Sequence, residues 1–220
     1  MEIDFKSIIE RLQDTGYPAE PDKVYIKIQN AENLLKRGLD YFTNKQAVWC
    51  EQNYRPIVDW MSNNKGRGLL LAGECGLGKT LIGMRILPLI LNATCRKIVA
   101  CYKAQDLNTK PDEVLSKHIV YIDDIGTESI SNIYGNKRVP FAELCDLAEQ
   151  KGKLLIISTN YDVIHLAEKY GERTVDRLKA TTKYVSLTGE SLRNELLWQI
   201  FTNKPKNGLK LISRQHQKKF

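Results

Sequence analysis

The residues best suited to chemistry form a glycine-rich segment between an apolar run and a helical pattern. This segment, Gly73-Glu-Cys-Gly-Leu-Gly-Lys-Thr80, matches G-x4-G-K-T without a mismatch. Its glycines let backbone N–H groups converge on phosphate oxygens, and the helix that follows adds the positive end of its dipole. In such loops the lysine reaches the β- and γ-phosphates and the hydroxyl ligates Mg²⁺. The sequence therefore predicts a nucleoside triphosphate site formed by Gly73, Glu74, Cys75, Gly76, Leu77, Gly78, Lys79, Thr80 and Leu81.

Two carboxylates end a later apolar run, at Asp123 and Asp124. In P-loop ATPases the acid that ends such a strand holds the Mg²⁺ shell, and we expect its neighbour to polarise the attacking water. An acidic pair beside an apolar strand is costly unless a metal or partner compensates its charge. We therefore predict that Thr80 and Asp123 hold Mg²⁺ and that Asp124 is catalytic.

A third apolar run ends at Thr159 and is followed by Asn160. A short amide at this edge can orient the hydrolytic water or touch the γ-phosphate, although asparagine is also a common helix N-cap. Together with the two preceding motifs, its position predicts a catalytic role for Asn160.

Alternating strand and helix patterns must position these residues. Buried strands are expected at 68–73, 97–102, 118–125, 153–159 and 184–187, with helices near 79–91, 103–117, 138–151, 161–180 and 191–202. Apolar runs without alternation are typical of strands covered on both faces. The pattern predicts an α/β fold with a five-stranded parallel sheet flanked by helices, whose functional groups lie at the carboxyl ends of the strands.

Three helical segments precede the sheet. Phe5, Ile8, Ile9 and Leu12 have the spacing of an amphipathic helix, a second helix begins near Gln29, and a third ends before Asn63. We expect a helical N-terminal region at 1–63, an ATPase core at 64–190 and a final helix with a basic tail at 191–220. The Phe5–Leu12 stripe packs either on its own domain or in a groove on another protein.

Composition excludes several classes of protein. The 220 residues are 42% hydrophobic and 27% charged, and they contain no apolar run of the ~18 residues that a transmembrane helix needs. The five cysteines are scattered, which favours reduced thiols in a cytoplasmic protein.

Lys and Arg exceed Asp and Glu by seven, and no acidic residue follows Glu195. The basic tail is either a contact to a phosphate-rich partner or a solvated end.

Taken together, the motifs resemble those of the AAA+ ATPases, and among them the DnaC/DnaI/IstB group of helicase loaders and transposase helpers. The matching segments are Walker A (73–80), Walker B with its extension (122–128), sensor 1 (157–160), the arginine-finger box (170–178) and sensor 2 (188–193). The resemblance implies a P-loop NTPase of the AAA+ type. Because 27 residues follow Arg193, it also implies a reduced C-terminal lid.

The resemblance also implies roles for two arginines. Arg177 matches the finger that reaches a neighbouring subunit's ATP, with Arg173 on the same helix as the fallback; the alternative is a surface arginine paired with Glu172 or Asp176. Arg193 matches the sensor of the γ-phosphate, or else it is a helix-end arginine. The second Walker B acid is Asp124, where many members carry the longer glutamate, so weaker water activation is expected.

In the loader group the loop after Walker B faces single-stranded DNA. The same loop here contains Ser131, Tyr134, Lys137 and Arg138, which the resemblance implies as DNA contacts. The alternative is an ordinary loop exposed to solvent. The resemblance implies an ATP- and Mg²⁺-dependent ATPase that assembles as a homo-oligomer on a DnaB-like replicative helicase. No membrane partner is expected. An IstB-like transposase helper on duplex DNA is the main alternative. A small-molecule kinase and a nucleotide-binding adaptor that scarcely hydrolyses ATP are the others.

Overall fold

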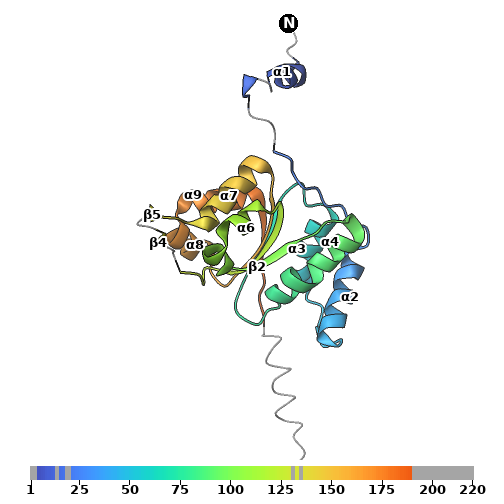
Figure 1. Ribbon diagram of the computed structural model, residues 1–220. Coiled ribbons are helices and arrows are strands. Elements are labelled where there is room, and N and C mark those ends of the chain that lie inside the picture. The colour runs from blue at the N-terminus through green and yellow to red at the C-terminus, as the bar shows by residue number, and fades with distance from the viewer. Residues whose placement is uncertain (1–3, 13–14, 18–20, 130–131, 134–135, 190–220) are drawn as a thin grey trace, which may run out of the picture.

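A computed structural model describes residues 4–12, 15–17, 21–129, 132–133 and 136–189 (Figure 1). Arg193, Ser131, Tyr134 and the helix expected at 191–202 lie outside these ranges.

A single five-stranded sheet forms the centre of the molecule, with the strand order β2-β3-β6-β1-β7 and every pairing parallel. The strands are β1 (Gly68–Ala72), β2 (Ala100–Lys103), β3 (Ile119–Ile125), β6 (Leu154–Thr159) and β7 (Thr182–Ser186). All five lie within or next to the predicted segments, which confirms the predicted α/β class. This topology brings the ends of β1, β3 and β6 to one edge.

Helices cover both faces of the sheet because its strands alternate between two cores. Leu69 and Leu71 of β1 belong to one core, and Leu70 belongs to the other. The first face is covered by α2 (Ala31–Thr43), α3 (Glu51–Ser62), the π-helix η2 (Leu81–Ile86) and α4 (Leu87–Cys95). The second is covered by α5 (Asp106–Thr109), α6 (Pro111–Ser116), α7 (Pro140–Lys151), α8 (Val163–Tyr170) and α9 (Glu172–Thr181).

Much of the region before the sheet packs into the first core. Val24, Ile26 and Ile28 are buried on an extended segment, and they join residues of α2 and α3 in the same cluster as Leu69. The buried Asn64 side chain accepts from the Ile26 N–H at 2.8 Å and donates to the Val24 carbonyl at 2.9 Å. Residues 24–62 therefore pack as part of the same body as the sheet, whereas α1 (Phe5–Leu12) has no buried residue.

The expected helix at 79–91 is divided into η2 and α4, which run from Leu81 to Cys95. Within η2, a Cβ added to Gly83 would lie 2.1 Å from Cε2 of the buried Tyr121 ring. The π-helix thus places its only glycine, Gly83, against the ring of Tyr121, whose hydroxyl contacts Asp123. Local spacing in the sequence does not indicate this contact, since Tyr121 lies on β3.

Other differences from the predicted elements are small. The expected helices at 103–117 and 161–180 are each split in two, the second at Gly171, whose φ of +88° a helix does not accept. A two-stranded antiparallel hairpin, β4 (Asn132–Ile133) and β5 (Asn136–Lys137), was not predicted. In the described part of the chain, every helix is too short or too polar to cross a membrane.

Candidate nucleotide-binding site

The glycine-rich loop connects the central strand β1 to η2. Within it, Lys79 is only 4% exposed, and its ammonium donates to the carbonyls of Gly73 at 2.7 Å and Glu74 at 2.8 Å. A third bond, of 2.7 Å, joins it to Oδ1 of Asn160 at the end of β6. A buried ammonium is stable only with such acceptors around it. The lysine ammonium is therefore held at the glycine-rich loop by three oxygen acceptors.

Thr80 and Asp123, the two predicted Mg²⁺ ligands, are in direct contact. The Thr80 hydroxyl donates to the Asp123 carboxylate, with oxygen–oxygen distances of 2.9 and 3.2 Å. Both supply hard oxygen donors, and Mg²⁺ at nucleotide sites takes one or two such side chains together with phosphate oxygens and water. The described residues contain no cluster of three or more His, Cys, Asp or Glu side chains that could hold a metal. The pair fits Mg²⁺ that arrives with a nucleotide.

Asp123 is fixed by two buried hydroxyls that the sequence analysis missed. Ser158 Oγ donates to its Oδ1 at 2.7 Å, and the Tyr121 hydroxyl donates to the same oxygen while lying 3.1 Å from Ser158 Oγ. Tyr121 and Ser158 are fully buried. Burial and the Asp123 carboxylate raise the pKa of Tyr121 above its usual value, so the phenol stays a donor. The available signal was the two-residue spacing of Tyr121 and Asp123 on one strand face.

Asp124 faces Asn160 across the edge of the sheet. Its backbone is left-handed, with a φ of +57°, and lies where the β3–β6 register shifts between Ile122 and Ile125. Its N–H donates to Ser158 Oγ at 2.9 Å, and Nδ2 of Asn160 lies 3.5 Å from its carboxylate. The register shift thus points two successive acids into the site. The structure brings together Lys79, Thr80, Asp123, Asp124 and Asn160.

The arginines of α9 lie in different surroundings. Arg177 forms ion pairs with Asp146 and with Glu149 (2.9 Å), both on α7, and its side chain is 15% exposed. Neither carboxylate belongs to Glu172 or Asp176, the two partners expected for a surface arginine. Arg173, one turn earlier, is exposed and forms no ion pair with any described residue. In the isolated chain, Arg177 therefore joins α9 to α7.

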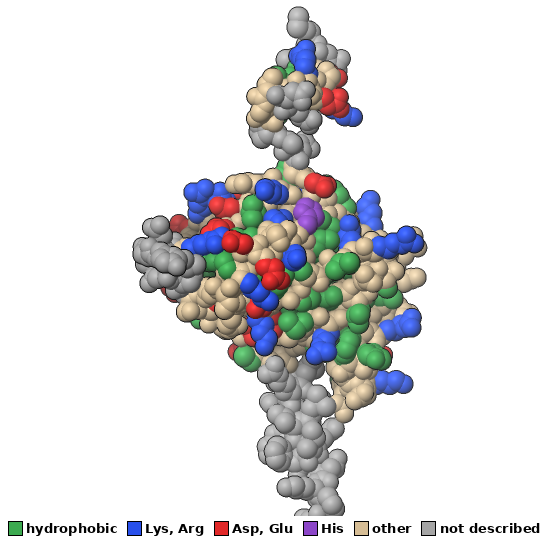
Figure 2. All heavy atoms as spheres, in the orientation of Figure 1, with side chains coloured by type: hydrophobic (Ala, Val, Ile, Leu, Met, Phe, Trp, Pro, Cys, Tyr) green, Lys and Arg blue, Asp and Glu red, His purple; other side chains and the backbone are tan. Residues whose placement is uncertain are grey.

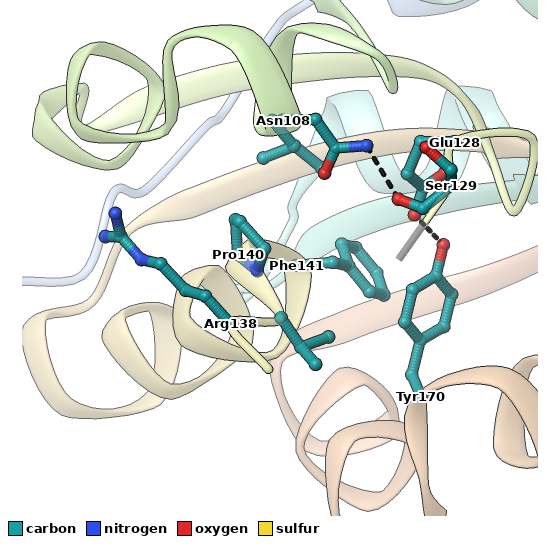
Figure 3. Close-up of a pocket in the computed structure, with 9 residues that line it drawn as sticks. Asn108, Glu128, Ser129, Arg138, Pro140, Phe141 and Tyr170 are labelled. Atoms are coloured by element: carbon teal, nitrogen blue, oxygen red, sulfur yellow. Dashed lines mark hydrogen bonds between the residues drawn. The ribbon is translucent and has the colours of Figure 1, made fainter. Parts of the chain in front are cut away.

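The segment between β3 and α7 is held from several sides (Figure 3). The Glu128 carboxylate is buried and accepts from the Gly126 N–H at 3.0 Å and from the Tyr170 hydroxyl. Lys169, beside Tyr170 on α8, donates to the Glu128 carbonyl at 2.5 Å. From α5, Asn108 donates to the Ser129 carbonyl at 2.6 Å. The residues just after the acidic pair are thus linked to α5 and α8.

Arg138, a predicted DNA contact, is paired within the chain. It forms ion pairs with Asp112 at 2.9 Å and with Glu143 at 2.8 Å, and these carboxylates raise its pKa further above its usual value. Lys137 is the last residue of β5. A phosphate would have to compete with two carboxylates for Arg138.

Comparison with known proteins identifies the family. The model of the family described as Novel STAND NTPase 3 matches residues 51–206, which include the whole site. The chain belongs to this family. The members are NTPases, in agreement with the P-loop geometry, and the chain is therefore an NTP-hydrolysing enzyme. No curated protein matches it by sequence.

Several solved structures are similar to the chain at low identity. The DnaC helicase loader is 17% identical, with 74% of this chain and 94% of that chain covered and a TM-score of 0.47. DnaI is 16% identical, with 74% and 85% covered and a TM-score of 0.47. AMPPCP-bound DnaA from Aquifex aeolicus is 13% identical, with 74% and 55% covered and a TM-score of 0.47. At such identities the likeness concerns the fold alone.

Proposed function

We propose that this chain is an ATP- and Mg²⁺-dependent ATPase of the helicase-loader type. The observation that carries the ATPase proposal is the contact of Thr80 with Asp123 beside the Lys79–Asn160 pair. These are the groups that a Mg²⁺–triphosphate needs, and they lie in the glycine-rich loop and at the ends of the strands β3 and β6.

In the ATP complex, Lys79 would exchange its contacts with Gly73 and Glu74 for oxygens of the β- and γ-phosphates. Thr80 and Asp123 would hold Mg²⁺, which neutralises charge on those phosphates when bound. Asp124 and Asn160 would then orient the attacking water between them, with Asp124 accepting its proton. The shorter side chain of Asp124 favours slow turnover.

Two arginines would complete the site. We propose Arg177 as the finger that contacts ATP on a neighbouring copy, which requires it to exchange Asp146 and Glu149 for phosphate; Arg173 is the alternative on the same helix. Arg193 would contact the γ-phosphate of its own copy. Hydrolysis would then depend on assembly.

The proposed partners are a DnaB-like replicative helicase and single-stranded DNA in the cytoplasm. Support comes from the order and spacing of the five sequence motifs that resemble the loader group. We propose the loop with Ser131, Tyr134, Lys137 and Arg138 as the DNA contact. An IstB-like role on duplex DNA uses the same core motifs and is the competing assignment.

The test uses size-exclusion chromatography with light scattering. The full chain is run alone, with the hexameric replicative helicase from the same source, and with duplex DNA, each with and without ATP. We expect a defined helicase complex. If the helicase is not bound and particles instead grow on duplex DNA with ATP, the loader role is wrong and the transposase role replaces it.

Hydrolysis is tested separately by phosphate release, with the helicase and single-stranded DNA present so that the chain can assemble. We expect activity that requires Mg²⁺ and is lost in Lys79→Ala, because the triphosphate loses its main cationic contact. An equal rate in the wild type and in Lys79→Ala would contradict the ATPase proposal.

A further inference from the structure

The N-terminal helix α1 has an apolar face that nothing in the described structure covers. Phe5, Ile8, Ile9 and Leu12 follow one another at helical spacing, none is buried, and Phe5 is 69% exposed. A helix of eight residues is not stable by itself in water, so its stability must come from packing of this face. The apolar face of α1 therefore requires an apolar surface to pack against.

The body of the protein offers an open apolar groove between α2 and α4, with a volume of about 470 Å³. Its apolar lining comes from Leu34, Tyr41 and Phe42 of α2, from Ile86 of η2, and from Leu89, Ile90 and Ala93 of α4. Tyr41 is 77% exposed and Leu89 is 59% exposed, so the groove is uncovered. Its shape suits a short amphipathic helix laid along it.

The groove contains one carboxylate that can pair with a cation of α1. Lys6 and Arg11 flank the apolar stripe of α1, on either side of the helix. Asp40 and Arg37 line the groove. In the described part of the chain, none of these four side chains forms an ion pair. The Asp40 carboxylate is therefore available to a cation that flanks an inserted helix.

The groove is not filled by α1 of the same chain. In Figure 1, α1 lies beyond the upper end of the body, whereas α2 lies at its lower right, beside α4. On the same side of the molecule, Figure 2 shows hydrophobic side chains lying among projecting Lys and Arg side chains. The exposure of Tyr41 and Leu89 agrees with this separation.

We propose that the α2–α4 groove binds helix α1 of a second copy of this chain. Each copy then donates one helix and offers one groove, so the contact is head-to-tail and can repeat into a ring or a filament. The contact does not involve the nucleotide site, and it can be tested without nucleotide, helicase or DNA.

The experiment measures the mass of the full chain by light scattering over a range of concentrations. The variants are Ile9→Asp in the helix and Leu89→Asp in the groove; Leu89 is exposed, so its replacement leaves the core intact. The control is Ile98→Asp, at a residue that is 78% exposed and does not line the groove. The wild type and the control should self-associate, whereas each variant should associate about 100-fold more weakly, because its carboxylate would be buried without a partner.

Mixing the two variants identifies the contact. The Ile9→Asp chain retains its groove and the Leu89→Asp chain retains its helix, so an equimolar mixture should form dimers and nothing larger. A mixture that stays monomeric, a wild type that stays monomeric at every concentration, or variants that associate like the wild type would each overturn the proposal.

Discussion

At the scale of single residues, Asp123, which we propose as a Mg²⁺ ligand, accepts hydrogen bonds from the buried hydroxyls of Tyr121 and Ser158. Tyr121→Phe keeps the ring against Gly83 but removes one hydroxyl from the carboxylate. We expect the Mg²⁺ concentration for half-maximal activity to rise several-fold, because Asp123 loses part of its orientation, and stability to fall by about 1–2 kcal/mol.

A Mg²⁺ titration of phosphate release and a denaturant melt measure both effects. Tyr184→Phe is the control, since Tyr184 is half exposed and its hydroxyl forms no hydrogen bond with a described residue. An unchanged Mg²⁺ dependence in Tyr121→Phe would show that the Tyr121 hydroxyl is not needed to orient the acid.

The second acid, Asp124, lends itself to a different prediction. Asp124→Asn preserves size and leaves Asp123 and Thr80 in place, but it removes the base that we assign to the water. Turnover should fall by about 10²–10⁴-fold while ATP affinity changes little. Single-turnover hydrolysis and equilibrium binding of a fluorescent ATP analogue separate the two quantities. A parallel loss of binding would indicate instead that Asp124 holds the nucleotide.

At the scale of elements, α8 holds the segment that follows the acidic pair. Tyr170→Phe removes the hydroxyl that donates to the buried Glu128 carboxylate. Hydrogen bonds to charged groups contribute about 1.5–3 kcal/mol, so a loss in that range is expected in denaturant melts. Tyr161→Phe is the matched control because Tyr161, just before α8, is exposed and its hydroxyl forms no hydrogen bond with a described residue. Equal effects of the two changes would exclude a specific role for the Glu128 contact.

Element by element, the sequence predicted the parts whose signal is local. Buried strands show as apolar runs, and the glycine-rich loop at Gly73–Thr80 has a nearly unique pattern. The network around Asp123 was missed because Tyr121 and Ser158 resemble ordinary core residues until strand pairing brings them together. The partners of Arg177 were missed for the same reason, since α7 precedes it by about 30 residues. The β4–β5 hairpin has two residues per strand, too few for a periodic signal.

At the scale of the whole molecule, the proposed finger must act between copies. Lys79→Ala removes the lysine from the nucleotide site of its own copy but keeps the arginine on α9. Arg177→Ala removes that arginine but keeps the nucleotide site of its own copy. Each variant alone should be inactive as an assembly, with a loss for Arg177→Ala within the range of about 10³–10⁵-fold known for such arginines. A mixture should regain activity, because Lys79→Ala copies supply the finger to intact sites.

Stability must be measured alongside, since Arg177 also pairs with Asp146 and Glu149 and its loss leaves both carboxylates without that partner. Arg173→Ala, one turn earlier on the same helix, is the control, and it should retain activity at every mixing ratio. If Arg173→Ala is the inactive variant and Lys79→Ala restores its activity, the finger is the exposed Arg173 and not Arg177. The proposal is wrong if Lys79→Ala restores activity neither to Arg177→Ala nor to Arg173→Ala, although all the proteins are folded and assemble. In that case neither arginine acts on a neighbouring copy, and α9 serves to pack on α7.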